Sequence, residues 1–245
     1  MTKQPEDNGV DGGTGTAEAG GPDAPTLAED LLLLLFQPDS GTIAGENTLF
    51  YVLAGAVLAD LALEERVTTT TTRTGATRVE AVDGRAPSDE LLRAAWDYIS
   101  DKPGKVQTVL AAIGPTLRRP VLERLIARGD IGEENRKTLG LFKTKALVVG
   151  GNGRRAGLVH DIGAVLVDGA APAPRVAALA GLIWASGTLP QFDPEIPWSS
   201  AVITRAQQLE RGNWGAGAAG EAVTRTMSAI IASAVVVAMS VRPRG

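Results

Sequence analysis

The stretch "LAEDLLLLLFQP", Leu27–Pro38, sets five consecutive leucines and a phenylalanine between two acidic residues and a proline. Thr26 before it and Glu29 three residues later form a capping-box pattern, which is typical of a helix start. Proline cannot continue a helix, so we expect the helix to end by Pro38. About ten helical residues extend ~15 Å, roughly half of the ~30 Å hydrocarbon core of a bilayer. The stretch is therefore predicted to be the first core helix of a folded bundle, not a membrane-spanning segment.

The composition fits a globular protein and narrows its chemistry. The chain has 245 residues, 44% of them hydrophobic, which is enough for a sizeable core. It contains no cysteine, which excludes disulfides and thiolate metal sites and favours a reducing, cytoplasmic compartment. With one histidine, His160, we expect no metal site and no cofactor. Arginine outnumbers lysine, eighteen to six, which is typical of a bacterial sequence of high GC content.

Patterns along the chain predict one mainly α domain. Residues 1–25 are acidic and glycine-rich, and we expect them to be disordered. Residues 26–241 are predicted to form a single helical bundle with one or two β-hairpins, and residues 242–245 a short tail. One hairpin is expected around Thr74 and Gly75, and two short β segments or a loop between Thr138 and Arg155. The apolar C-terminal helix, residues 221–241, is expected to be a buried core helix.

Positive charge is concentrated in the middle of the chain. Residues 102–155 contain twelve Lys/Arg and four Asp/Glu, whereas the rest contains twelve basic and twenty-four acidic residues. Such an asymmetry indicates a localised anionic partner, such as a membrane surface, a phosphate group or nucleic acid. A solvated surface paired with acidic neighbours is the alternative.

Four arginines of this segment are candidate ligands for an anion: Arg118, Arg119, Arg124 and Arg128. Arg124 and Arg128 are four residues apart and share a helix face. The guanidinium fork suits phosphate oxygens, and the helix start near Arg118 and Arg119 favours an anion. We therefore predict that these four side chains bind a phosphate or phospholipid headgroup.

A second candidate surface follows them. Leu141 and Phe142 are interleaved with Lys143 and Lys145, and an apolar tip flanked by lysines suits an anionic bilayer. The same pattern suits contact with a partner protein or a second copy of the chain. Ordinary packing of the hairpin would also explain it.

Nothing in the sequence points to catalysis. His160 and Asp161 are adjacent, but no G-x-S-x-G nucleophile motif accompanies them. The glycine turn "VVGGNGRR" lacks the lysine and hydroxyl residue of a phosphate-binding loop. We therefore expect a protein that is not an enzyme.

Several segments, taken in order, resemble the Golgi phosphoprotein 3 family, also called the 34-kilodalton Golgi phosphoprotein family. They are "TLAEDLLLLLFQPDSGTI", "LAGAVLADLALEERV", "LERLIARGDI" and "RVAALAGLIWASGTL". The likeness extends from about Pro25 to Val241, and the composition resembles bacterial members. It implies a mostly helical domain with a hairpin for membrane contact and self-association. It also implies binding of phosphatidylinositol 4-phosphate and, in eukaryotic members, linkage of glycosyltransferase tails to vesicle coats.

The lipid site that this resemblance implies is partly retained. The family uses a tryptophan in the loop after the first helix, but the matching residues 41–47 contain none. The family arginine of the second helix falls on Ala54. Of two basic positions before the hairpin, one falls on Arg118 and the other near Pro115, with Arg119 close by to compensate.

Three functions follow as hypotheses. The first is a peripheral, non-enzymatic protein that binds phosphatidylinositol 4-phosphate or another anionic lipid on the cytoplasmic membrane face. The second is an interaction adaptor, or a homo-oligomer, that uses the hairpin around Phe142. The third is a winged-helix-like nucleic-acid binder, because two amphipathic helices each run into a β ribbon; the acidic remainder of the chain weighs against it.

Overall fold

A computed structural model of the chain describes residues 24–73, 75–138, 142–214 and 220–241. Nearly all of the predicted disordered tail and the short C-terminal tail therefore lie outside the described residues. Mainly helical, the described part confirms the predicted fold class. Its elements are α1 (Leu27–Leu35), β1 (Phe36–Gln37), β2 (Thr42–Ile43), α2 (Leu49–Leu63), β3 (Val67–Thr71), β4 (Thr77–Ala81), α3 (Glu90–Asp101), β5 (Gly104–Lys105), α4 (Val106–Ile113), η1 (Gly114–Thr116), α5 (Arg118–Ala127), β6 (Ile131–Thr138), β7 (Phe142–Val149), α6 (Arg154–Leu166), α7 (Pro174–Ser186), η2 (Leu189–Phe192), α8 (Ser200–Glu210) and α9 (Glu221–Val241).

The five-leucine stretch forms α1 as predicted. Thr26 and Glu29 make both bonds of the capping box, and all nine residues of α1 are buried. The helix ends at Leu35, before Pro38, because Phe36 enters a short strand that pairs with Ile43 of β2. A helix buried on every side needs an apolar residue on every side, which the leucine run supplies.

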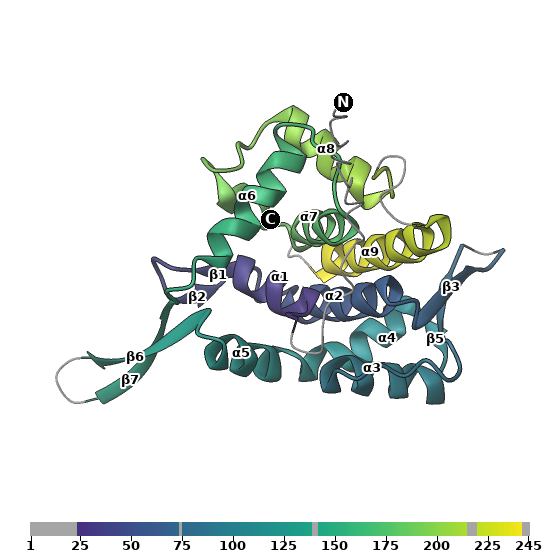
Figure 1. The fold of residues 1–245 in the computed structure, drawn as a ribbon, viewed down its shortest axis with the longest axis horizontal. Coiled ribbons are helices and arrows are strands. Elements are labelled where there is room, and N and C mark those ends of the chain that lie inside the picture. The colour runs from purple at the N-terminus through teal and green to yellow at the C-terminus, as the bar shows by residue number, and fades with distance from the viewer. Residues whose placement is uncertain (1–23, 74, 139–141, 215–219, 242–245) are drawn as a thin grey trace, which may run out of the picture.

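Helix α2 lies at the centre of the bundle, with α1, α3, α4, α7 and α9 packed around it (Figure 1). Twelve of its fifteen residues are buried, so it is a core helix, as its apolar sequence predicts. Gly55 brings three helices close together. A Cβ atom at Gly55 would lie 3.1 Å from Leu182 of α7 and 3.2 Å from Ala234 of α9, so a larger residue would push these helices apart.

Two hairpins extend from opposite ends of the bundle (Figure 1). Strands β3 and β4 pair from Val67↔Ala81 to Thr71↔Thr77, around the predicted turn, and β5 adds to β4. Strands β6 and β7 pair from Ile131↔Val149 to Thr138↔Phe142. The sequence pattern predicted β structure only from Thr138 onwards, whereas β6 begins at Ile131. The residues of β6, "IGEENRKT", show no apolar alternation, and the strand forms because β7 supplies its backbone partners.

One helix in the described part of the chain, α9, is long and apolar enough to cross a membrane by length and composition. It packs along α2 and α7, and Met227, Ile230 and Ile231 on that side have no exposed surface. One face of α9 is therefore part of the core, whereas the other is not buried, with Val236 57% exposed, so the predicted buried helix is confirmed on one face only.

Candidate functional site

Two of the predicted ligand arginines, Arg124 and Arg128, lie against the first turn of α1. Arg128 Nε donates to Glu29 Oε1 at 2.9 Å, and Arg124 Nη1 lies 3.7 Å from Glu29 Oε2. Arg124 also donates to Asp89, the N-cap of α3, at 2.6 Å. Glu29 has no exposed surface. The two arginines share a face of α5, as predicted, but the anion between them is a core carboxylate of the protein itself.

Three more carboxylates, Asp30, Asp60 and Asp130, are buried around Arg154 and Arg175. Arg175 donates to Asp30 Oδ2 from Nε at 3.0 Å and to Asp60 Oδ1 from Nη1 at 3.2 Å. Arg154 donates to both Asp30 and Asp130. The carboxylates are at most 5% exposed. A buried charge without a counter-ion costs several kcal/mol. These contacts therefore fix the positions of α1, α2, α6 and α7 relative to one another.

We call these groups the buried ion network. It consists of four carboxylates and the four arginines that contact them: Glu29, Asp30, Asp60, Asp130, Arg124, Arg128, Arg154 and Arg175. Its arginines come from the basic segment of the chain and from α7, so part of the positive charge detected in the sequence compensates acidic residues of the core. The net charge of a segment thus overstates the charge available to an external partner.

Asp60 gives the network a pH dependence. Burial raises the pKa of Asp60 from 3.8 to about 7, although Arg175 and the Leu27 N–H, which donates to Asp60 Oδ2 at 2.6 Å, act in the opposite direction. At pH values between 3.8 and about 7, Asp60 is mostly protonated in the folded protein and mostly ionised in the unfolded chain. The free energy of unfolding should therefore fall as pH rises from about 4 to about 7 by the contribution of this residue.

This prediction is checked by urea unfolding of the wild type and of Asp60→Asn, whose side chain does not titrate, at intervals between pH 4 and pH 8. The stability of the wild type relative to the variant should decrease as pH rises through that range and then level off above about pH 7. An increase in this difference with pH would mean that Asp60 is ionised in the folded protein.

The other predicted ligand arginines, Arg118 and Arg119, lie at the exposed start of α5. Their side chains are 48% and 88% exposed. Arg118 Nη2 donates to Glu46 Oε1 at 2.9 Å, and Arg119 Nε donates to Glu123 Oε1 at 2.8 Å. Both carboxylates are themselves more than half exposed. The two arginines are thus adjacent in the chain but have different partners, and only surface ion pairs restrain them.

Glu46 is a neighbour of Arg118 that the sequence did not reveal. It belongs to the segment 41–47, where the resemblance implied a tryptophan, and it lies 72 residues before Arg118 in the chain. The other implied positions offer no cation: Ala54 is fully buried in α2, and Pro115 lies in η1. At the position of the implied lipid site, the structure therefore has Arg118 paired with the carboxylate of Glu46.

Three of the four predicted membrane- or partner-contact residues lie in β7 of the second hairpin. Leu141 is outside the described residues. Phe142, Lys143 and Lys145 belong to β7, which pairs with β6 along its whole length. The hairpin projects away from the helices beyond the end of α5 (Figure 1). The arginines at the start of α5 and this hairpin therefore lie along one side of the bundle, separated by the length of α5.

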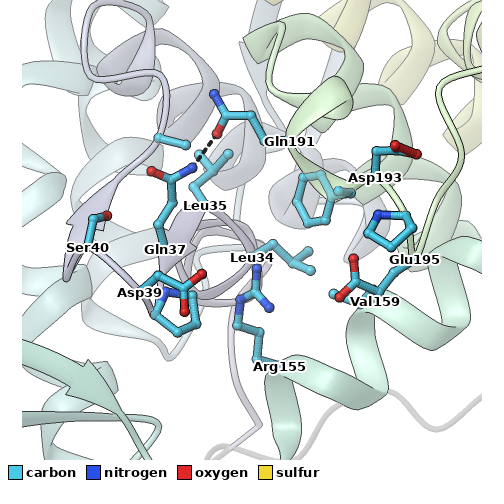
Figure 2. A pocket seen from close by; sticks show the side chains of 14 residues that line it. Leu34, Leu35, Gln37, Asp39, Ser40, Arg155, Val159, Gln191, Asp193 and Glu195 are labelled. Carbon is cyan, nitrogen blue, oxygen red and sulfur yellow. Dashed lines mark hydrogen bonds between the residues drawn. The ribbon is translucent and has the colours of Figure 1, made fainter.

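A separate pocket of about 570 Å³ lies between the end of α1, the β1–β2 turn, the start of α6 and the segment that follows η2 (Figure 2). The Gln37 side-chain amide donates to Gln191 Oε1 at 2.7 Å and joins two of its walls. Arg155 rises from α6 into the pocket (Figure 2). Arg155 belongs to the glycine turn "VVGGNGRR", but Gln37 and Gln191 stand out in no sequence pattern, because they lie 154 positions apart.

The described residues contain no group of three or more His, Cys, Asp or Glu side chains placed to hold a metal ion. His160 lies in the middle of α6 with its side chain exposed, and Asp161 beside it is exposed as well. The geometry therefore adds no support for a catalytic role of this pair.

Comparison with known proteins identifies the family of the chain. The family model described as Golgi phosphoprotein 3 (GPP34) matches residues 27–226, which is most of the chain. A search of curated proteins gave no match. The matched range runs from the first residue of α1 into α9 and includes the start of α5, the second hairpin and the pocket.

Proposed function

The chain belongs to the Golgi phosphoprotein 3 family, and from this premise we propose that it is a non-enzymatic, peripheral protein that binds anionic phospholipid headgroups. Arg118 and Arg119 supply the first contacts with the headgroup phosphate. The lysines of the second hairpin, Lys143 and Lys145, supply further attraction to the same membrane surface. The protein acts on the cytoplasmic face of a membrane, and phosphatidylinositol 4-phosphate is one of the lipids it accepts.

The observation that carries this proposal is the exposure of Arg118 and Arg119 together with the weakness of their present partners. An exposed ion pair contributes about 0–1 kcal/mol, so a phosphate group can replace Glu46 or Glu123 at little cost. A guanidinium donates two parallel hydrogen bonds to phosphate. By contrast, Arg124 and Arg128 already neutralise buried Glu29 and stay with the fold.

Arg118 and Arg119 are exposed, whereas Arg124 and Arg128 contact a buried carboxylate, and this difference favours a lipid over nucleic acid as the ligand. A winged-helix-like unit would need the arginines of α5 to face a duplex, yet Arg124 and Arg128 turn towards α1. Arg118 and Arg119 form an exposed pair at one point of the surface, which suits a headgroup better than a run of backbone phosphates. An adaptor role through the projecting β6–β7 hairpin (Figure 1) is the second candidate.

Substitution of Glu46 tests the proposal, because it should increase the affinity of the protein for anionic vesicles. The wild type should co-sediment with vesicles of phosphatidylglycerol and phosphatidylcholine, less so as salt increases, and not with phosphatidylcholine alone. Glu46→Gln should bind the anionic vesicles about fivefold more tightly, because one charge near such a surface is worth about 1 kcal/mol.

The control for this test is Glu221→Gln. Glu221 is also an exposed partner of an arginine, Arg225, but lies on α9, so the variant changes the net charge equally at a distant site. Its vesicle binding should stay close to that of the wild type. Equal gains in the two variants would show a general charge effect, and no gain for Glu46→Gln would remove Arg118 from the proposed site.

A further inference from the structure

The pocket beside α1 contains an arginine without a strong counter-ion. Arg155 is half-buried, and its Nε donates to the carbonyl oxygen of Phe36 at 3.1 Å, which fixes the guanidinium in the pocket. Within the described part of the chain, no carboxylate forms an ion pair with it. Burial lowers the pKa of Arg155, and the nearby charges of Glu195 and Asp39 offset this only in part. Within the described residues only Nε of Arg155 has a hydrogen-bond partner, so the two Nη groups are available to donate to a bound anion.

The rim of the same pocket is acidic. Asp39 stands on one side of Arg155, and Asp193 and Glu195 stand on the other (Figure 2). The three carboxylates are on exposed residues and outnumber the single arginine. A ligand that carried only negative charge would be repelled by the rim, and one that carried only positive charge would meet the arginine below. The charge pattern is thus complementary to a molecule with both signs.

The rest of the lining is mostly apolar, with Gln37, Ser40 and Gln191 as its polar members. Leu34 of α1, Val159 of α6 and Phe192 of η2 border the pocket. Its volume of about 570 Å³ lies within the range of roughly 300–1,000 Å³ that is usual for small-molecule sites. The pocket therefore has room for an apolar group beside the charged ones.

We propose that this pocket binds a small zwitterion, whose carboxylate or phosphate accepts hydrogen bonds from Arg155 and whose ammonium group lies beside Asp39 at the acidic rim. An apolar substituent of the ligand contacts Leu34, Val159 and Phe192. This chemistry is shared by amino acids with apolar side chains and by the headgroup of ethanolamine phospholipids. The site is separate from Arg118 and Arg119, and the inference does not rest on the function proposed above.

Calorimetric titration of the full-length protein with two probes, L-leucine and sn-glycero-3-phosphoethanolamine, tests the proposal. Saturable binding of at least one probe is expected, and it should be at least about tenfold tighter than binding of acetate, inorganic phosphate or ethylamine. Binding of leucine alone identifies a free amino acid as the source. Binding of the glycerophosphate probe, together with co-sedimentation with phosphatidylethanolamine vesicles, identifies a lipid.

Variants assign the binding to the pocket. Arg155→Gln should weaken it at least about tenfold, Arg155→Lys should weaken it less, and Asp39→Asn should weaken the zwitterion but not acetate. The control is Arg205→Gln, because Arg205 of α8 is also part-buried with its Nε near a backbone carbonyl, that of Val165 at 3.4 Å. Thermal unfolding of each variant verifies folding. No saturable binding of either probe, equal binding of the single-charge ions, or unchanged binding by a folded Arg155→Gln would overturn the proposal.

Discussion

Arg175→Ala is expected to lower the free energy of unfolding by about 3–5 kcal/mol. The substitution removes the side chain that contacts Asp30 and Asp60 together, and both carboxylates are buried. Asp30 keeps Arg154 as a partner, but Asp60 keeps only the Leu27 N–H. Urea unfolding at pH 8, where Asp60 is ionised, gives the largest effect. At pH 5 the loss should be smaller because Asp60 is then protonated.

Two further variants separate this effect from the general loss of a charged side chain. Arg93→Ala breaks an exposed i,i+4 pair with Asp97 and should cost less than about 1 kcal/mol. Asp60→Asn in the Arg175→Ala background should recover part of the lost stability, because it removes the carboxylate left unpaired. Equal costs for Arg175→Ala and Arg93→Ala would mean that the buried ion network contributes no more than a surface pair.

The start of the fold could be predicted from the sequence because its determinants are local. The capping box, the leucine run and the proline all lie within residues 26–38, and they specify where α1 begins, that it is buried and where the chain must turn. The hairpin around Gly75 is local in the same way. Side chains within a few residues of one another decide these elements, so no knowledge of distant partners is needed.

The role of the acidic residues of α1 could not be predicted in this way. The sequence pattern predicted a local capping role for Glu29 and indicated no distant partner for either Glu29 or Asp30. In the structure they are also buried counter-ions of Arg128 and Arg175, which lie 99 and 145 residues further along the chain. Pairing at such separations depends on the packing of whole helices, which composition and periodicity do not specify.

The candidate site shows the same limit. The basic segment was found from charge alone, but charge did not distinguish Arg118, which faces solvent and Glu46, from Arg124, which faces the core. Arg155 ends the glycine turn "VVGGNGRR", but its pocket could not be predicted because the acidic and apolar residues around it come from other segments. The basic side chains of a segment can be counted in its sequence. The fold determines which of them are exposed to an external ligand and which are paired within the core.

The second large effect is expected for Arg118→Ala/Arg119→Ala. If these side chains contact the headgroups, losing two charges near an anionic surface weakens binding by about 2 kcal/mol, or roughly 30-fold in the dissociation constant. Stability should hardly change, because both ion pairs are exposed. Unfolding curves of the variant therefore confirm that reduced vesicle binding is not caused by loss of the fold.

A matched variant with the same change in net charge is Arg211→Ala/Arg225→Ala. Both arginines are exposed, one at the end of α8 and one on α9, and Figure 1 shows these helices across α2 from α5. Removing them should change vesicle binding by less than about threefold, since the protein would still present α5 and the second hairpin to the membrane.

Membrane binding through the start of α5 is tested by the ratio of the dissociation constants of these two double variants for phosphatidylglycerol vesicles at low salt. We expect Arg118→Ala/Arg119→Ala to bind at least about tenfold more weakly than Arg211→Ala/Arg225→Ala. A ratio near one, with both proteins folded, would contradict it and leave the exposed start of α5 without a role in membrane binding.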